Sequence, residues 1–279
     1  MRHISFQSIV EQTKKLLIKM NYELDQSFVS LIQKAKVKED RDLAKSILDD
    51  ILANHDLSKQ GDFPMCQDTG MVVVFAKIGE LCQIEGSLFD AIQQGVREAY
   101  ETGYLRKSVV LHPFDRINSK DNTPAIIHTE LVAGDQLTLK IAAKGAGSEN
   151  MSALKMLTPT EGIEGVKTFV KDTVLAAGGR ACPPIILGIG IGGNLEKCAL
   201  MAKEALFRPL EDHHEDASIR ALEQTLYEEV NALNVGPMGV GGKTTCLAVK
   251  INIHPMHIAS LPVAVNIQCH ANRHLEVTL

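Results

Sequence analysis

Several features of membrane, secreted and nucleic-acid-binding proteins are missing from this sequence. It has no apolar run long enough to span a bilayer, and its amphipathic N-terminus, MRHISFQSIVEQTKKLL, lacks the apolar core of a signal peptide. Basic residues are not in excess, because 29 Lys and Arg stand against 34 Asp and Glu, giving a formal net charge of −5. We therefore expect a cytoplasmic protein that binds neither membranes nor nucleic acids.

The cysteines include no close pair, which excludes a zinc knuckle and a CxxC redox motif. In a reducing cytoplasm they are expected to be thiols. The default interpretation of each is a small buried apolar residue. The six cysteines are Cys66, Cys82, Cys182, Cys198, Cys246 and Cys269.

What is present is an ordinary globular composition, with 279 residues, 45% hydrophobic and 23% charged. Residues 1–60 carry apolar side chains at helical spacing, and the pattern breaks at KQGDFPMCQDTG. Strands and helices then follow one another, which predicts a mixed α and β fold. A turn at Ala133, Gly134 and Asp135 predicts that residues 124–145 form a hairpin. The other expected strands are 71–78, 183–193, 246–253 and 261–267, and the other expected helices are 87–104, 163–179, 195–210 and 219–235.

The stretch GPMGVGGKTT, residues 236–245, resembles a phosphate-binding loop. That loop requires a glycine five positions before Gly242, where this chain has Pro237. Proline has no N–H to offer a phosphate. The stretch also follows a helical pattern and precedes a strand pattern, which is the reverse of a phosphate loop. An ATPase is therefore not favoured.

A second glycine motif, GIGIGGNLEKCA, places Gly188, Gly190 and Gly193 between a strand and a helix, as in a dinucleotide fingerprint. The fingerprint also needs an acidic residue about twenty positions on, at the end of a second strand. Glu211 and Asp212 are near that distance but follow a helix directly. A nicotinamide cofactor is therefore a minor alternative, although such a turn can bind any anion.

Polar residues of the types that catalyse reactions or bind metals and substrates occur in four turns. CQDTG places a thiol, an amide and a carboxylate side by side, although a structural turn is the alternative. KGAGSEN can form a nest of N–H donors or a plain tight turn. In ACPP, two prolines follow Cys182 and stiffen the main chain beside it. A cysteine held in this way can be a metal ligand or a buried core residue. The C-terminal cluster fits no standard zinc spacing and can also be a His-rich surface; it comprises His254, His257, Cys269, His270, Arg273 and His274.

Taken together, these motifs resemble the class I, iron–sulfur-dependent fumarate hydratases. The matching stretches, in order, are CQDTG, GYLRKS, DNTPAIIH, KGAGSEN, ACPPIILGIGIGG, GPMGVGGKTT and QCHANRH. The resemblance covers residues from about 60 to 279. The related L-tartrate dehydratases share CQDTG and CPP but depart from KGAGSEN and QCHANRH, so the resemblance favours fumarase.

The resemblance implies a mixed α+β fold of the class I fumarase N-terminal, cluster-domain type. A helical segment, residues 1–60, would precede β-sheets packed with helices in the cluster- and substrate-binding part, residues 61–279. The whole chain, residues 1–279, would form a single α-type domain.

The resemblance also implies the site residues. Cys66, Cys182 and Cys269 would hold three irons of a [4Fe–4S] cluster, leaving the fourth iron open to substrate. Asp68 and His257 would be catalytic. The expected substrate-binding residues are Gln67, Asp68, Arg106, Gly145 and Gly147. Ala146 stands where relatives often have glycine, and Lys243 and Thr244 receive no role.

The activity implied is the interconversion of fumarate and (S)-malate, a step of the tricarboxylic acid cycle. A β subunit would supply the base and further carboxylate-binding residues, so the chain alone is expected to be nearly inactive. An α–α dimer within an α2β2 assembly is expected. The alternatives are an L-tartrate dehydratase α subunit, a nucleotide-binding enzyme and a zinc-binding module.

Overall fold

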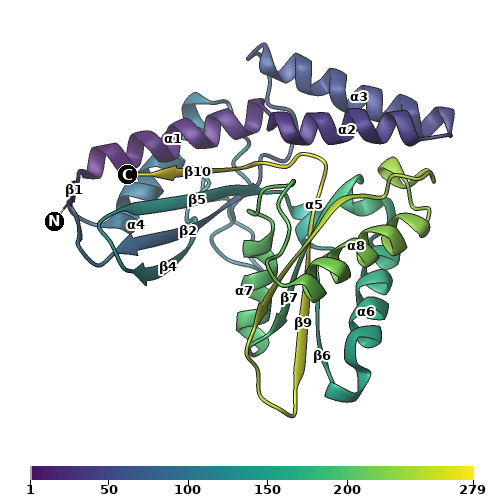
Figure 1. The fold of residues 1–279 in the computed structure, drawn as a ribbon. Coiled ribbons are helices and arrows are strands. Elements are labelled where there is room, and N and C mark those ends of the chain that lie inside the picture. Colours follow the sequence, from purple (N-terminus) through teal and green to yellow (C-terminus); the bar gives the residue numbers. More distant parts are fainter. Residues whose placement is uncertain (1) are drawn as a thin grey trace. The chain divides into compact units, whose positions relative to one another are not determined.

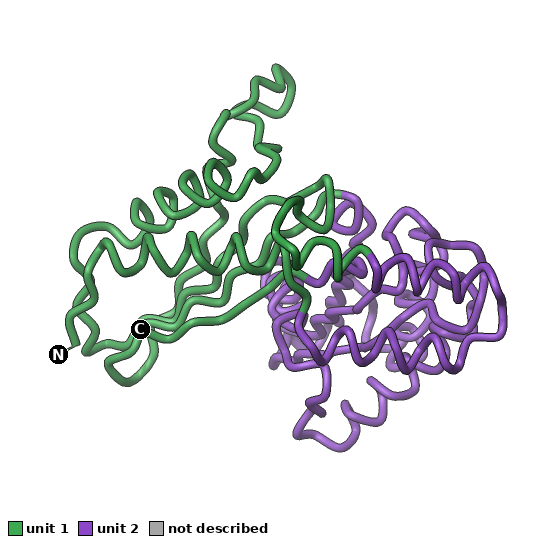
Figure 2. The backbone as a smooth tube through the Cα atoms, turned by 90° about the horizontal axis from the view of Figure 1, so that it is seen from above, with its two compact units in different colours: residues 1–24, 54–146, 273–279 green, residues 25–53, 147–272 purple. Residues whose placement is uncertain are grey.

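A computed structural model describes residues 2–279, which contacts between Cα atoms divide into two compact units. Unit 1 comprises residues 1–24, 54–146 and 273–279, and unit 2 comprises residues 25–53 and 147–272 (Figure 2). The chain therefore passes from unit 1 to unit 2 and back twice. The mixed α and β class is confirmed, whereas the single domain over residues 1–279 stays a prediction.

Helices at the N-terminus match the predicted helical segment. They are α1 (Phe6–Tyr22), α2 (Gln26–Lys38) and α3 (Asp42–Lys59), and the boundary between the units falls within α3 (Figure 1). Ser5 caps α1 and Asp25 caps α2, because each side chain accepts a hydrogen bond from a main-chain N–H of the first turn. The short strand β1 (Arg2–Ile4), which the sequence analysis missed, pairs in parallel with β3 (Cys82–Ile84).

Unit 1 is built on a four-stranded sheet in the order β10-β5-β2-β4. Its strands are β2 (Met71–Gly79), β4 (Ile126–Val132), β5 (Leu137–Lys144) and β10 (His274–Thr278). Helices α1 and α4 (Leu88–Thr102) pack against the sheet and each other. Alternate residues of β2 and β5 point into this core, including Val72, Val74, Leu139 and Ile141.

The predicted hairpin over residues 124–145 is wrong, because β2 lies between β4 and β5. β2 is apolar over MVVVFA and nearly all buried, so it takes the centre of the sheet, while the more polar β4 takes the edge. The turn at Gly134 crosses the end of β2. A Cβ on Gly79 would lie 2.6 Å from the Gly134 oxygen, so this crossing requires a glycine.

Unit 2 contains a second four-stranded sheet, in the order β6-β9-β7-β8. Its strands are β6 (Ala153–Leu157), β7 (Ile185–Gly192), β8 (Cys246–His254) and β9 (Leu261–Gln268). Strands β7 and β8 are parallel, and β9 is antiparallel to β7 and β6. The sequence pattern predicted β7, β8 and β9, whereas β6 was not expected.

The two faces of this sheet carry different helices. Helices α6 (Gly162–Ala177) and α8 (Ala217–Ala232) share an apolar core with Ile185, Leu187 and Ile189 of β7. Helix α7 (Leu195–Ala205) packs on β7 from the other side (Figure 1). The remaining helical pieces are α5 (Ala146–Glu149) and the 3₁₀ turns Pro159–Glu161, Gly178–Ala181 and Pro237–Gly239.

The glycines of β7 serve helix packing. A Cβ on Gly188 would lie 2.1 Å from the Ala202 oxygen of α7, and one on Gly190 would lie 2.0 Å from the Cys198 oxygen. The resemblance of GIGIGG to a dinucleotide fingerprint therefore reflects the close approach of α7 to the sheet.

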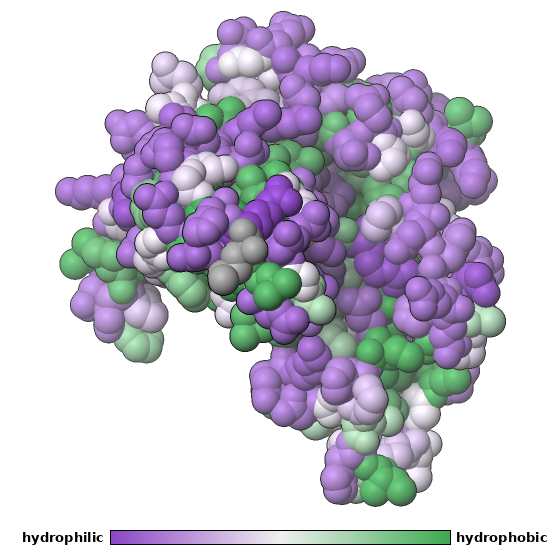
Figure 3. Space-filling model, turned by 60° about the vertical axis from the view of Figure 1, so that its left-hand side comes forward, coloured by the Kyte–Doolittle hydropathy of each residue, from purple (hydrophilic) through white to green (hydrophobic). Residues whose placement is uncertain are grey.

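On the face shown in Figure 3, hydrophilic residues predominate and hydrophobic residues occur in small groups. Exposed apolar side chains include Phe114, Leu131 and Ile258. Among residues 2–279, no helix is both long and apolar enough to cross a bilayer.

Candidate functional site

The Cys66–Gly70 turn of unit 1 is held by four separate segments of that unit. Its central carboxylate, Asp68, accepts hydrogen bonds from the N–H of Gly70 (3.0 Å) and the N–H of Ala146 (2.7 Å). Gly70 has φ 83°, and a Cβ there would lie 2.7 Å from the main chain of Ala143 and Lys144 in β5. Only glycine fits this close approach.

Two other motifs of unit 1 meet the same turn. The Thr69 hydroxyl donates to the main-chain oxygen of Arg106 (3.0 Å), and the Asn122 side chain donates to the oxygen of Gly70 (3.1 Å). The Tyr100 hydroxyl lies 2.8 Å from the oxygens of both Thr69 and Gly70. The stretches GYLRKS, DNTPAIIH and CQDTG, far apart in sequence, therefore converge in one unit.

Arg273 is a residue of this site that the sequence analysis gave no role. It is 2% exposed, and its Nη1 donates to the main-chain oxygen of Asp68 (2.6 Å) and to Asn21 Oδ1 (3.1 Å). Its buried Nε has no hydrogen-bond partner among the described residues. The only signal in the sequence was its place in QCHANRH.

Gly145 lies where Arg273 and Asp68 come together. A Cβ at Gly145 would lie 3.2 Å from Arg273 Nη2 and 3.3 Å from Asp68 Oδ2. A glycine therefore leaves room beside a guanidinium and a carboxylate. The predicted N–H nest of KGAGSEN is in part engaged within the protein, because the Ala146 N–H is bound to Asp68.

The remaining predicted substrate-binding residues differ in their surroundings. Gln67 and Arg106 are exposed in unit 1, and Asp68 is half-buried there. Gly147 belongs to unit 2, where a Cβ would meet only the Arg180 oxygen, at 3.6 Å. The substrate-binding role of all these residues stays a prediction.

Two of the three predicted cluster cysteines belong to unit 2, on segments that touch. The Cys182 oxygen accepts from the His270 N–H (3.2 Å) and lies 3.0 Å from His270 Nδ1, so it sits against the residue after Cys269. Cys182 has φ 54°, a left-handed conformation uncommon for a residue with a side chain. Cys66 belongs to unit 1.

The chemistry of the cysteines separates them into two sets. Cys66, Cys182 and Cys269 are half-buried and lie outside the helices and strands, and Cys82 is half-buried in β3. Cys198 and Cys246 are buried, and burial raises the pKa of both, that of Cys246 to about 12. Iron ligands must be thiolates reachable by the metal. Cys66, Cys182 and Cys269 are therefore each exposed enough to serve as a ligand, although no group of three or more His, Cys, Asp or Glu within residues 2–279 is arranged to hold a single metal ion.

The glycine-rich stretch 236–245 holds a carboxylate of its own unit. Glu39, 3% exposed between α2 and α3, accepts from the N–H of Lys243 (2.8 Å) and the N–H of Thr244 (3.2 Å). The Lys243 ammonium pairs with Asp40 (2.7 Å). The rejection of an ATPase loop is consistent with these contacts, since an internal carboxylate occupies the amides.

His257, predicted to be catalytic, lies exposed between β8 and β9. Its Nδ1 accepts from the Ala259 N–H (3.1 Å). An open pocket of about 430 Å³ in unit 2 is lined by His257 together with Gly193, Asn194, Lys197, His254, Pro255 and Met256. Within unit 2, His254 and His257 of the C-terminal cluster therefore line this pocket, whereas His270 lies against Cys182.

Comparison with known proteins identifies the family. The model of the fumarate hydratase (Fumerase) family matches residues 10–278. The chain belongs to this fumarate hydratase family. It is 43% identical over 259 residues to the Methanocaldococcus jannaschii protein named "Putative L(+)-tartrate dehydratase subunit alpha", covering 90% of each chain. It is 30% identical over 249 residues to the L(+)-tartrate dehydratase subunit alpha of Escherichia coli K12, covering 88% of this chain and 82% of the relative.

These findings make the chain an α-type subunit of a hydro-lyase in the fumarate hydratase family, related to tartrate dehydratase. Relatives named as α subunits imply a separate partner subunit. The predicted preference for fumarate over tartrate is not supported by the names of the relatives, which favour tartrate.

Proposed function

We propose that the chain is the α subunit of an iron–sulfur hydro-lyase that dehydrates L(+)-tartrate. The assignment of tartrate as the substrate rests on the 43% identity to a relative named for tartrate dehydratase, over 90% of both chains. Interconversion of fumarate and (S)-malate is the second candidate, supported by the family description and by the motifs KGAGSEN and QCHANRH. Both substrates are four-carbon dicarboxylates that lose or gain water.

Cys66, Cys182 and Cys269 would hold a [4Fe–4S] cluster. When bound, such a cluster supplies a Lewis acid for the departing hydroxyl, which is otherwise a poor leaving group. In support, these three thiols are half-buried and lie outside the helices and strands, whereas Cys82 lies in β3 and Cys198 and Cys246 are buried.

The chain's own residues would bind and orient the substrate. The exposed guanidinium of Arg106 suits bidentate recognition of one carboxylate. Gly145 leaves room for substrate beside Arg273 and Asp68. The two N–H donors on Asp68 fix its carboxylate, which can then take part in proton transfer at the carbon next to a substrate carboxylate. We propose His257 as the second catalytic residue. The cytoplasmic location and the α2β2 assembly stay predictions.

The substrate is tested with the chain co-produced anaerobically with its partner subunit. We expect oxaloacetate to form from L(+)-tartrate with a kcat/KM at least about tenfold higher than that for malate dehydration, a difference of ~1.4 kcal/mol in transition-state binding. Faster turnover of malate would instead assign the fumarase reaction. Absence of both activities in a cluster-containing complex would refute the proposed function.

The cluster ligands are tested by iron and acid-labile sulfide content after anaerobic reconstitution. The parent should hold about four of each, and Cys66→Ala, Cys182→Ala and Cys269→Ala should each lose most of the sulfide. Cys82→Ala is the matched control, because Cys82 is also half-buried but lies outside the ligand set. Sulfide retained in the three variants would contradict the assignment.

A further inference from the structure

Unit 2 contains a cavity that belongs to none of the segments assigned above. It has a volume of about 500 Å³ and lies between α8, the β8 edge of the sheet and the segment Leu210–His213, with Leu31 of α2 at one side. A cavity of this size accommodates a small organic molecule. The lining residues used below are Asp212, His213, Arg220, Glu223, Tyr227 and Val249.

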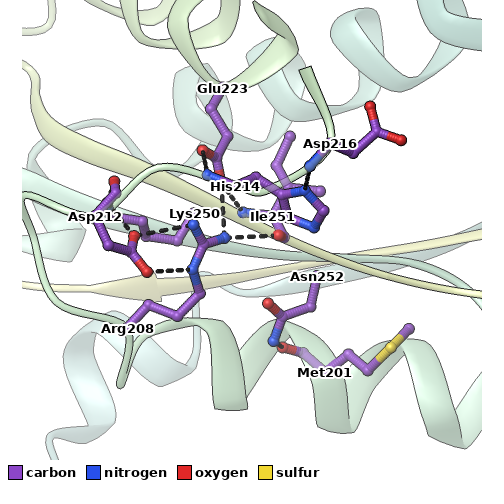
Figure 4. Close-up of polar contacts among 9 residues, drawn as sticks. All are labelled: Met201, Arg208, Asp212, His214, Asp216, Glu223, Lys250, Ile251 and Asn252. Carbon is purple, nitrogen blue, oxygen red and sulfur yellow. Dashed lines mark hydrogen bonds and ion pairs between the residues drawn. The ribbon is translucent and has the colours of Figure 1, made fainter. Parts of the chain in front are cut away.

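One wall of the cavity is a fixed network of charges (Figure 4). The Lys250 ammonium, 4% exposed, donates to the main-chain oxygen (2.6 Å) and Oδ1 (2.9 Å) of Asp212. Arg208 donates to both carboxylate oxygens of Asp212 and to Glu223 Oε1 (2.8 Å). Burial by itself raises the pKa of Asp212, but the hydrogen bonds from Arg208 and Lys250 outweigh it and lower the pKa. These four charges balance and are already paired.

The free edge of β8 is capped by side chains at two points. The Ile251 N–H donates to Glu223 Oε1 (2.7 Å), and its oxygen accepts from Arg208 Nη1 (2.8 Å). Further back along the strand, the Cys246 N–H and oxygen bond to the Asn231 side chain (2.9 and 3.1 Å). These caps satisfy an edge that has no further strand beside it.

Between the two caps, beyond a register shift after Cys246, the strand edge at Val249 has no capping side chain, and Val249 itself is only 5% exposed. Successive residues of a strand direct their N–H and C=O groups to opposite edges. Val249, two residues before Ile251, therefore points its N–H and C=O toward the same free edge. Within residues 2–279, no hydrogen bond at this edge is found for Val249, which lines the cavity. The uncapped part of the β8 edge, between Cys246 and Ile251, is too short for another strand to pair with it. The N–H and C=O of Val249 are therefore better suited to a small molecule.

The cavity wall also carries one exposed cation, Arg220, that is not paired with a carboxylate of the described residues. The Arg220 guanidinium makes no hydrogen bond or ion pair with any residue in the described part of the chain, and His213 is another lining residue of the cavity. Tyr227 adds a phenol whose pKa is raised by burial, so it remains a hydrogen-bond donor near neutral pH. Asp216 is occupied by capping α8 through Ser218 and Ile219.

We propose that this cavity binds a small molecule with a planar heterocycle and an anionic group, of the class of nucleoside monophosphates. The donor–acceptor edge of the base would pair with the N–H and C=O of Val249, and the phosphate would bind Arg220. The site is separate from both glycine motifs, 188–193 and 236–245, and its binding does not depend on the proposed hydro-lyase chemistry.

The experiment is calorimetric titration of the full chain with AMP, GMP, CMP and UMP. At least one of the four should bind. Its nucleoside, which lacks the phosphate, and ribose 5-phosphate, which lacks the base, should each bind at least about tenfold more weakly. Arg220→Gln should weaken the nucleotide about tenfold or more while leaving the nucleoside unchanged. If none of the four binds up to about 10 mM, where affinity is negligible, the proposal is overturned.

A cavity-blocking variant locates the site. Ala221 is exposed on α8 and lines the cavity, so Ala221→Trp should abolish binding without disturbing the core. Ala232→Trp, on the same helix but outside the cavity, should bind like the parent. Equal binding by both variants would overturn the assignment of the nucleotide to this cavity.

Discussion

At the scale of single residues, the site depends on how buried polar groups are used. Asp68 receives two main-chain N–H donors and Arg273 holds the oxygen of the same residue. A buried guanidinium is costly unless it is hydrogen-bonded, so Arg273 is retained where its bonds order the Cys66–Gly70 turn. Asp68, which we propose to be catalytic, is thus positioned by a residue that is far away in sequence.

Arg273→Lys tests this positioning. Lysine keeps the charge, but its shorter side chain does not reach the position of Nη1, the nitrogen that donates to both Asp68 and Asn21. We expect the free energy of unfolding to fall by about 2 kcal/mol and hydro-lyase kcat to fall at least about tenfold, measured by urea denaturation and by assay with the partner subunit.

The matched control is Arg97→Lys, since Arg97 is half-exposed and its carboxylate partner is 4.0 Å away. It should change stability by less than about 0.5 kcal/mol. Equal effects at the two positions would show that Arg273 has no special role in the turn.

At the scale of elements, the two glycine-rich motifs are structural contacts rather than nucleotide loops. GIGIGG brings α7 onto β7, and GPMGVGGKTT binds Glu39 from the connection between α2 and α3. Both contacts depend on glycine, because a residue without a Cβ lets a neighbouring segment approach its main chain closely.

Gly190→Ala tests the packing of α7. Its Cβ would lie 2.0 Å from the Cys198 oxygen and 2.8 Å from the Ala202 nitrogen, both main-chain atoms of a helix that must move. We expect a loss of at least ~2 kcal/mol in the free energy of unfolding. Gly147→Ala, which meets only one atom at 3.6 Å, should leave stability nearly unchanged. A stable Gly190→Ala protein would contradict this account of the glycines.

At the scale of the whole molecule, we expect the chain to hold only part of the proposed active site. Relatives carry the name of an α subunit, and the base and further carboxylate-binding residues are expected on the partner. We therefore expect the binding energy for a dicarboxylate to be divided between two proteins.

The chain purified alone, with its cluster reconstituted, should dehydrate tartrate at least about a hundredfold more slowly than the complex, because positioned groups that contribute to the transition state are missing. Titration with the partner subunit should restore activity to a plateau at a one-to-one ratio. Full activity without the partner would show that the site is complete in this chain.

The sequence by itself determined the main helices, most of the long strands and the family. Helical and strand periodicities are local, because they follow from backbone geometry over a few residues, and motifs such as CQDTG are readable without coordinates. Local patterns also excluded the ATPase loop, since Pro237 cannot donate an N–H.

Only the tertiary structure decided which distant segments meet. It placed β2 between the two strands of the expected hairpin, brought Arg273 to Asp68, seated Glu39 in the glycine loop and left Val249 open at the β8 edge. The physical reason is that strand order and buried polar contacts depend on the total burial and hydrogen bonding of many segments at once, which no local pattern records.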